Sequence, residues 1–574
     1  MYDVIIRNGT IVDGSGAPKF VGDVAVQKGV IAEVAPKIEA PAIKEVDATG
    51  MIVTPGFVDL HTHYDAQATW DPFVSPSGWH GCTTVVMGNC GVGFAPCKPE
   101  NREWLINVME GVEDIPGSAL TEGIQWDWET FPEYLDALER MPRAVDVAAQ
   151  VPHSAVRCYV MGDAGSENDD ATPEQIEEMR RITVEGLKAG ALGFSTSRTP
   201  LHRSAAGNLV AGTFAQIDEL KAFGMALKDA GFGVFEAALE HIIVPSELTW
   251  LREIAEESGQ TVIFNLSQTW EYPQMWKQVL EQLEDAAANN VGLYAQSAGR
   301  AIGILMTWLG SAHPFLVYPE FWSLTYGLSD EEKLEKLKDP EVRAKILADS
   351  PVDAGEFNNF IATSFDKMFL FSEYLDYEPD ESQSVAAVAK RQGKTPQEVA
   401  YDAMIAEDGR GFLYFPLFNY AEGGLEPLFY MHQHERVRMG LSDGGAHCGA
   451  ICDAGMPTFM LTHWTRDRKR GEKLELEWVI HRQTQQTAET YGMFDRGLLK
   501  PGYRADINVI DYENLKLGSP KMVNDLPAGG RRLLQRVSGY KMTMCKGEII
   551  LENDTPTEAR PGTLVRGPQP APNI

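Results

Sequence analysis

The central part of the chain alternates short apolar runs with amphipathic segments of helical length. This alternation is typical of βα units arranged around a parallel sheet. The predicted strands are residues 52–61, 83–89, 145–151, 191–196, 233–236, 261–265, 292–296 and 438–442. Eight such strands predict an α/β fold of the (β/α)₈ TIM-like barrel type.

Helix-start signals between these runs support the barrel. The segments Thr172-Pro173-Glu174-Gln175 and Thr395-Pro396-Gln397-Glu398 each offer a capping threonine, a proline at the first helical position and a returning Gln or Glu. Gly190 is expected to end the first of these helices.

The two ends of the chain show a different pattern of short strands and turns. In the first fifty residues, Asn8-Gly9 and Lys28-Gly29 predict tight reversals. A similar pattern returns near the C-terminus. We therefore expect residues 1–55 and 498–555 to form one small β-sandwich domain, attached to a barrel domain of residues 56–497.

Two further segments do not fit a simple barrel. Residues 297–437 separate the last two strands, whereas a βα loop typically has about 2 to 6 residues. We expect this insertion to carry its own helices and to lie over the barrel mouth. Residues 556–574 are rich in proline and glycine, which predicts a C-terminal arm that packs on a neighbour or stays mobile.

Composition narrows the classes of partner and the compartment. The net charge of −32 over 574 residues repels phosphates and acidic lipid heads, so we expect neither nucleic acid nor a membrane as partner. The N-terminus lacks the features of a signal peptide, and no run of 18 apolar residues occurs. Seven scattered cysteines do not suggest a disulfide framework, which favours the cytoplasm.

Candidate chemistry begins in the stretch GFVDLHTHYD. Successive side chains of a strand alternate in direction, so Asp59, His61 and His63 should point together toward the barrel axis near its C-terminal mouth. A His-x-His pair is common, and two hydrogen-bonded polar histidines are the alternative to a metal site. The position at the mouth favours the metal site.

Two more candidates end other strands. Cys90 in VVMGNCGVG lies between glycines on a loop, where a thiolate near a divalent cation would be a ligand. A buried cysteine that serves only as a small apolar residue is the alternative, and it fits Cys82 better. Asp443 in GLSDGGAH is either part of a simple turn or a carboxylate that binds metal and takes a proton from water.

The joint run of motifs resembles a known family. GFVDLHTHYD, TTVVMGNCGVGFAP, RCYVMG, GALGFSTS, LSDGGAH and RGLLKPGYRADINVID occur in the order and spacing of the amidohydrolase superfamily. The chain is similar over nearly its whole length to the D-aminoacylase branch, the N-acyl-D-amino-acid deacylases. The resemblance implies a (β/α)₈ barrel, a β-sandwich built from both termini and zinc-dependent hydrolysis of a C–N bond.

The resemblance also implies roles for particular residues. His61 and His63 match metal ligands of the first strand, Cys90 a thiolate ligand, and Asp443 a ligand that is also the general base. Two motifs depart from the family: GVFEAALEH places Glu236 near an expected histidine, and IFNLSQT has none. We favour one firmly bound zinc, with a second site that uses Cys90 and Glu236 as the alternative.

Four further residues are candidates for contacts with the substrate. His153 could donate a hydrogen bond to the substrate carbonyl, or be satisfied by its own loop. Arg198 and Arg300 could clamp a substrate carboxylate, or form ordinary ion pairs. His447 could support the substrate or Asp443.

These features together predict a zinc-dependent enzyme that cleaves the amide bond of an N-acyl amino acid or a related small-molecule amide. A cyclic-amide or ester hydrolase, hydantoinase-like or lactonase-like, is the second prediction. A barrel that binds without catalysing is the third. We also expect a homo-oligomer, because of the size of the barrel and its apolar insertion.

Overall fold

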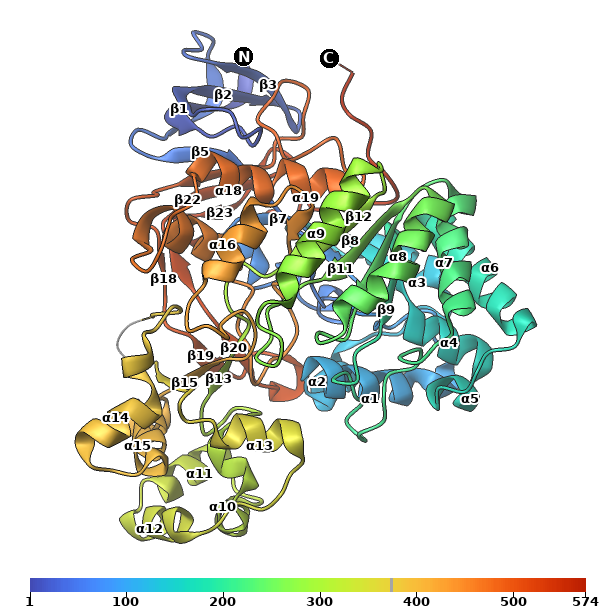
Figure 1. Ribbon diagram of the computed structural model, residues 1–574. Helices are drawn as coiled ribbons and strands as arrows, with labels where there is room; N and C mark the ends of the chain where they lie inside the picture. The colour runs from blue at the N-terminus through green and yellow to red at the C-terminus, as the bar shows by residue number, and fades with distance from the viewer. Residues whose placement is uncertain (372–374, 574) are drawn as a thin grey trace.

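A barrel of eight parallel strands forms the centre of the computed structural model, which describes residues 1–371 and 375–573 (Figure 1). In spatial order the strands are β16 (Val437–Met439), β12 (Leu293–Ser297), β11 (Thr261–Asn265), β10 (Val234–Ala238), β9 (Gly193–Ser197), β8 (Asp146–Pro152), β7 (Cys82–Met87) and β6 (Phe57–Asp59). A parallel bridge between Thr62 and Gly444 joins the two outermost strands just beyond their ends. The predicted barrel is confirmed.

The first predicted strand, 52–61, is divided between two sheets. Its first part is β5 (Ile52–Pro55), which belongs to a separate sheet, and its second part is β6. The chain crosses at Gly56, where an added Cβ would lie 2.2 Å from Thr83 Oγ1. Only glycine permits this close approach.

The separate sheet contains both ends of the chain, as expected. It is a mixed, nine-stranded sheet in the order β24-β23-β22-β17-β5-β1-β2-β3, with β4 paired to β1. Its members are β1 (Tyr2–Ile11), β2 (Phe20–Gln27), β3 (Val30–Ala35), β4 (Ala42–Asp47), β5, β17 (Ile507–Ile510), β22 (Tyr540–Cys545), β23 (Glu548–Glu552) and β24 (Thr555–Pro556). Strands from the first and last sixty or so residues therefore pair directly, since β5 lies antiparallel to β17.

One of the two predicted reversals is wrong. Asn8-Gly9 lies inside β1, where the pairing with β2 shifts register and Asn8 has a φ of 58°. These residues form a bulge, because the extra residue is absorbed without reversing the strand. Lys28-Gly29 does connect β2 to β3, with positive φ at both residues.

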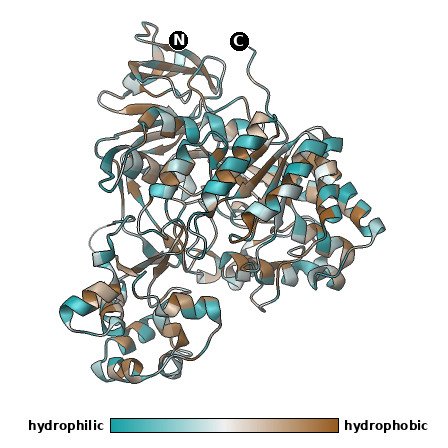
Figure 2. Cartoon of the chain, in the orientation of Figure 1, coloured by the Kyte–Doolittle hydropathy of each residue, from teal (hydrophilic) through white to brown (hydrophobic). Residues whose placement is uncertain are grey.

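Amphipathic helices surround the barrel on its outer side. The expected capping boxes are present at the start of α6 (Pro173–Ala189), which lies beside the barrel, and of α15 (Pro396–Gly409), which belongs to the insertion. Figure 2 shows apolar colouring along the barrel strands and mixed colouring on the helices around them. Among the described residues, no helix combines the length and the apolar character needed to cross a bilayer.

The insertion between β12 and β16 builds a lobe with its own hydrophobic core. It contains the sheet β13 (Gly303–Met306), β15 (Leu413–Pro416) and β14 (Phe369–Leu370), and helices α10 to α15 that lie together at the bottom of Figure 1. Its base contacts loops at the C-terminal ends of barrel strands: Phe418 stacks on His241 after β10, and Asn419 N donates to Gln268 O after β11.

The C-terminal arm packs on its own barrel. Val147 of β8 pairs with Leu564, and Val565 N donates to Val147 O at 2.8 Å. Arg566 forms ion pairs with Asp136 and Glu139 of α3 (Phe131–Arg140). Over these residues the arm therefore packs on the barrel of its own chain.

Candidate metal centre

Four polar side chains converge at the C-terminal mouth of the barrel. The ligand atoms of His61, His63 and Cys90 lie within 4.8 Å of one another. His61 Nε2 lies 3.2 Å from Cys90 Sγ and 3.5 Å from Asp443 Oδ1, and His63 Nε2 lies 3.8 Å from the same oxygen. The two imidazoles and the carboxylate therefore lie together at the mouth of the barrel.

Backbone pairing beyond the strand ends creates this arrangement. Asp443 N donates to His61 O, and His63 N donates to Gly444 O, so the extensions of β6 and β16 run side by side. Alternation then turns His61 and His63 to one side, while Thr62 faces away and donates to Val86 O.

The backbone is unusual at two of the four residues. Cys90 and Asp443 have φ of 54° and 48°, which L-residues adopt only where the surrounding structure holds them. Gly91 lies so close to β9 that an added Cβ would be 2.8 Å from Ser197 N. The loop that presents Cys90 therefore crosses the end of β8 and packs closely against β9, which restricts the position of the thiol.

The imidazoles face the centre with nitrogens free to bind a cation. His61 Nδ1 and Gln296 Oε1 are 2.9 Å apart; because that oxygen can only accept, Nδ1 carries the proton and Nε2 has the lone pair. His63 Nδ1 lies 3.2 Å from Glu113 Oε1. Burial lowers the pKa of His61 to about 4, so the neutral, ligand form is present at neutral pH.

The pKa values of the two carboxyl groups at the centre, Asp443 and Glu236, are also shifted. Burial raises the pKa of Asp443 to about 8, with a further contribution from Asp453 and Asp59. Burial also raises the pKa of Glu236 to about 8, although its Oε2 accepts a hydrogen bond from Cys90 N at 3.0 Å. A divalent cation between these groups would restore their charged forms.

The group fits a cation in its chemistry as well as its geometry. Glu236 Oε1 is buried and has no hydrogen-bond partner among the described residues. A carboxylate oxygen without a partner, a thiol and two imidazoles together form a donor set that binds zinc in preference to calcium or magnesium.

Comparison with known proteins agrees with this centre. A family model described as the amidohydrolase family matches residues 44–551. The chain belongs to the amidohydrolase family. The N-acyl-D-aspartate deacylase of Alcaligenes xylosoxydans xylosoxydans is 27% identical over 518 residues, which cover 89% of this chain and 86% of that one. The D-aminoacylase of the same organism is 37% identical over 195 residues, 34% of this chain and 37% of the relative.

Solved structures share the fold of this amidohydrolase. A crystal structure of D-aminoacylase has a TM-score of 0.65 at 22% identity, covering 99% of this chain and 100% of that one. The N-acyl-D-glutamate deacylase of Bordetella bronchiseptica, solved with zinc and a phosphonate inhibitor, has the same TM-score and coverage at 20% identity. The predicted D-aminoacylase-like family and the class of hydrolase acting on non-peptide C–N bonds are both confirmed.

In this amidohydrolase, both ring nitrogens of His153 contact other buried side chains. It begins α4 (His153–Met161), and its Nδ1 and Nε2 lie 2.8 Å from Thr196 Oγ1 and from Glu219 Oε1. Arg157 donates to the same carboxylate. Because both ring nitrogens already have partners, the structure corrects our placement of His153 beside the substrate carbonyl.

The two arginines differ in what they leave free. Arg198 donates through Nη1 to two backbone carbonyls and pairs with Glu247. Its contacts therefore match the alternative of an ordinary ion pair. Arg300 is buried and donates through Nε and Nη2 to Asp453 Oδ1, but its Nη1 has no partner in the part of the chain that the structure describes. Arg300 therefore keeps one unused donor group.

Sequence patterns missed the two groups that stand behind the histidines, Gln296 and Glu113. Gln296 lies at the end of β12, so a polar residue at a strand end was a signal that could have found it. Glu113 is the last residue of α1 (Arg102–Glu113), with no comparable signal. His447 does lie close by, with Nε2 3.9 Å from Glu113 Oε2.

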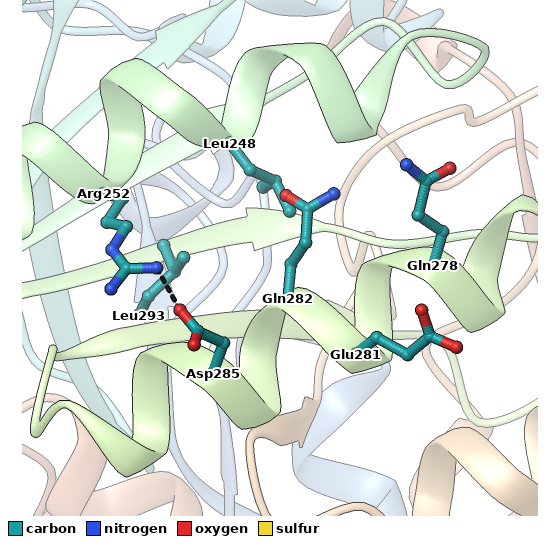
Figure 3. Close-up of a pocket in the computed structure, with 7 residues that line it drawn as sticks. All are labelled: Leu248, Arg252, Gln278, Glu281, Gln282, Asp285 and Leu293. Atoms are coloured by element: carbon teal, nitrogen blue, oxygen red, sulfur yellow. Dashed lines mark hydrogen bonds and ion pairs between the residues drawn. The ribbon is translucent and has the colours of Figure 1, made fainter.

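A separate surface groove of about 330 Å³ lies on the outer side of the barrel (Figure 3). It runs between α8 (Val244–Ser258) and α9 (Met275–Ala288), and Arg252 reaches across it to Asp285. None of the metal-centre residues lines this groove. It is the polar junction of two outer helices.

Proposed function

We propose that this amidohydrolase uses zinc to hydrolyse the amide bond of an N-acyl amino acid. The observation that carries the proposal is the convergence of His61, His63 and Cys90 on Asp443 at the barrel mouth. The similarity to a D-aminoacylase and to an N-acyl-D-aspartate deacylase supports this substrate class.

His61, His63 and Asp443 would hold the ion, with Cys90 and Glu236 completing its surroundings. A zinc ion bound there would lower the pKa of a water molecule and polarise the substrate carbonyl. One firmly bound ion is favoured, because the group of His61, His63 and Cys90 includes no histidine from β10 or β11 among the described residues, and Glu236 of β10 joins it through Cys90 N.

Asp443 is the general base of the proposed reaction. Its carboxylate takes a proton from the attacking water as the water oxygen bonds to the carbonyl carbon. The same proton then passes from Asp443 to the leaving nitrogen as the C–N bond breaks, which gives a carboxylic acid and a free amine. The side chain of Asp443 is only 13% exposed, which limits exchange of this proton with solvent.

Arg300 is the preferred residue to bind the substrate carboxylate. Its unpartnered Nη1 is a buried charged donor, and a carboxylate is the acceptor such a donor binds best. The partner of Arg300, Asp453, is close enough to Asp443 to contribute to its raised pKa. The guanidinium thus belongs to the same region as the proposed base.

The test combines metal analysis with a panel of substrates. We expect about one zinc per chain, release of amine from N-acyl amino acids, and loss of activity on chelation that zinc restores. The panel includes both enantiomers, uncharged N-alkyl amides, hydantoins and lactones. Turnover of hydantoins or lactones alone, or activity indifferent to chelation, would overturn the proposal.

A further inference from the structure

Helix α1 ends at a point where three distant segments of the chain meet. Its last residue, Glu113, is 1% exposed. Glu113 Oε1 lies 3.2 Å from His63 Nδ1, and Oε2 lies 3.9 Å from His447 Nε2. His447 N also donates to the backbone oxygen of Glu113. One helix end therefore touches a proposed zinc ligand and the loop that follows Asp443.

The next residue, Asp114, reaches the insertion. It caps α1 in the left-handed conformation, with a φ of 52°. Its carboxylate accepts hydrogen bonds from Ser311 Oγ at 2.7 Å and from Gly449 N at 2.9 Å. Ser311 belongs to the 297–437 insertion, and an added Cβ at Gly449 would lie 2.0 Å from its Oγ. These segments are therefore packed without slack.

The contact between Glu113 and His63 selects a tautomer. His63 Nδ1 is buried and makes no hydrogen bond within the described ranges, and the acceptor oxygen Glu113 Oε1 lies 3.2 Å from it. A proton on Nδ1 leaves the lone pair on Nε2, the nitrogen that faces Asp443. A carboxylate behind a metal-binding imidazole also makes that imidazole a stronger ligand.

The position of α1 is itself fixed. Gly111, two residues before Glu113, lies so close to the loop after β9 that an added Cβ would be 2.1 Å from Ser204 C. The helix end cannot retreat in that direction without moving this loop. A displacement of Asp114 by the insertion should therefore also shift the position of Glu113.

We propose that Glu113 is a positioning residue for His63 and that Asp114 couples it to the insertion through Ser311. The insertion, although remote from the metal ligands in sequence, thereby adjusts the affinity of the centre for its ion. This inference rests on the proposed zinc site and adds a control of that site by the lobe.

The test measures zinc affinity by competition with a chelator, in the full-length protein. Glu113→Gln should weaken zinc binding about 10- to 100-fold, because a neutral amide oxygen is a poorer acceptor than a carboxylate. Glu113→Ala should weaken it further. Glu103→Gln, an exposed site on the same helix, is the matched control and should bind as the wild type does.

Two further readouts separate positioning from a merely structural role. Ser311→Ala should weaken zinc binding in the same direction by a smaller factor, and should change the visible spectrum of the cobalt(II)-substituted protein. In the metal-free state, Glu113→Gln should unfold at the same temperature as the wild type or higher, because it replaces a buried carboxyl group by an uncharged amide of the same size.

The outcomes distinguish the two proposals. If the wild type binds no zinc, the proposed site and this inference both fail. If the wild type binds zinc and the Glu113 and Ser311 variants bind it equally tightly, the inference alone is overturned. Weakened binding that follows lower metal-free stability would also overturn it, because the effect would then be one of folding.

Discussion

At the scale of single residues, the centre depends on the groups behind its ligands as much as on the ligands. Gln296 stands behind His61 and Glu113 behind His63, so a neutral acceptor serves one imidazole and a carboxylate the other. The carboxylate polarises its imidazole more strongly. His63 should therefore donate to the ion more strongly than His61.

The first prediction concerns the proposed base. Asp443→Asn keeps the size of the side chain but removes its ability to take a proton. We expect kcat on the preferred amide to fall about 10²- to 10⁴-fold, the range typical of a lost general base. Steady-state kinetics on zinc-loaded protein of measured metal content would check this. Activity near that of the wild type would rule out Asp443 as the base.

The second prediction concerns the carboxylate and thiol that complete the centre. Glu236→Gln and Cys90→Ser each replace a proposed ligand by a poorer one. If both contact the ion, each variant should bind zinc less tightly, while Cys82→Ser, which alters a buried thiol of β7, should retain the wild-type stoichiometry. Metal content per chain after dialysis decides the matter. Full zinc content in both variants would confine the ligands to His61, His63 and Asp443.

The third prediction separates the two arginines. Arg300→Met should raise KM for substrates that carry a carboxylate much more than for uncharged amides, because the guanidinium bonds only to the anionic group. Arg198→Met should leave this ratio unchanged, since its donors serve backbone carbonyls and Glu247. Parallel kinetics on an N-acyl amino acid and on its amide would measure the ratio. An equal rise for both substrates would remove Arg300 from substrate recognition.

At the scale of elements, the sequence was most informative for site residues whose direction is set by the end of a single barrel strand. The His-x-His pair and Asp443 were found because alternation and strand order fix where such side chains point. His153 also follows a strand, but α4 begins at that residue and turns its ring into an internal network. Glu113 could not be found, because its place depends on how the long segment between β7 and β8 packs, which no local pattern records.

A buried ion network links the insertion to the π-helix Met460–Asp467. Glu378 accepts hydrogen bonds from Arg468 at 3.0 Å and 3.1 Å, and lies 3.0 Å from His463 Nε2. Burial by itself raises the pKa of Glu378, but these partners outweigh it and leave the pKa at about 2. The carboxylate is therefore charged in the folded protein over the whole neutral and mildly acidic range.

The fourth prediction follows from that lowered pKa. A depressed folded-state pKa contributes stability above the unfolded-state value of about 4.5 and loses it as the pH falls toward 2. Glu378→Gln should therefore destabilise the protein at pH 7, by up to about 3 to 5 kcal/mol, because the buried Arg468 is left with the exposed Glu426, 3.4 Å away, as its carboxylate partner. The variant should also lose stability less steeply between pH 5 and pH 2. Thermal unfolding across that range measures both effects, and parallel curves would contradict the assignment.

At the scale of the whole molecule, the two ends of the chain pair with each other, and the C-terminal segment packs against the barrel. The N-terminal strands pair with C-terminal ones through β5 and β17, so the sheet forms only after β17 has been synthesised. The last segment then returns to the barrel and adds backbone pairs beside β8. Composition predicted an extended arm, but proline and glycine content alone does not say what an arm lies against.

The fifth prediction concerns this arm. Gly562 N donates to Arg143 O and Val565 N to Val147 O, and the side chains of Leu564 and Val565 are 8% and 3% exposed. Burying each of these two side chains contributes about 1.5 to 3 kcal/mol. Ending the chain after Arg560 should therefore lower the unfolding temperature clearly, whereas ending it after Gln569 should not, since the removed residues are mostly exposed.

Leu564→Ala, expected to cost about 2 to 5 kcal/mol, distinguishes lost packing from lost backbone pairing. Because β8 borders β7, the strand that leads to Cys90, the chain that ends after Arg560 should also bind zinc less tightly. A shortened chain that unfolds with the wild type and keeps its zinc would show that the arm contributes nothing to the barrel.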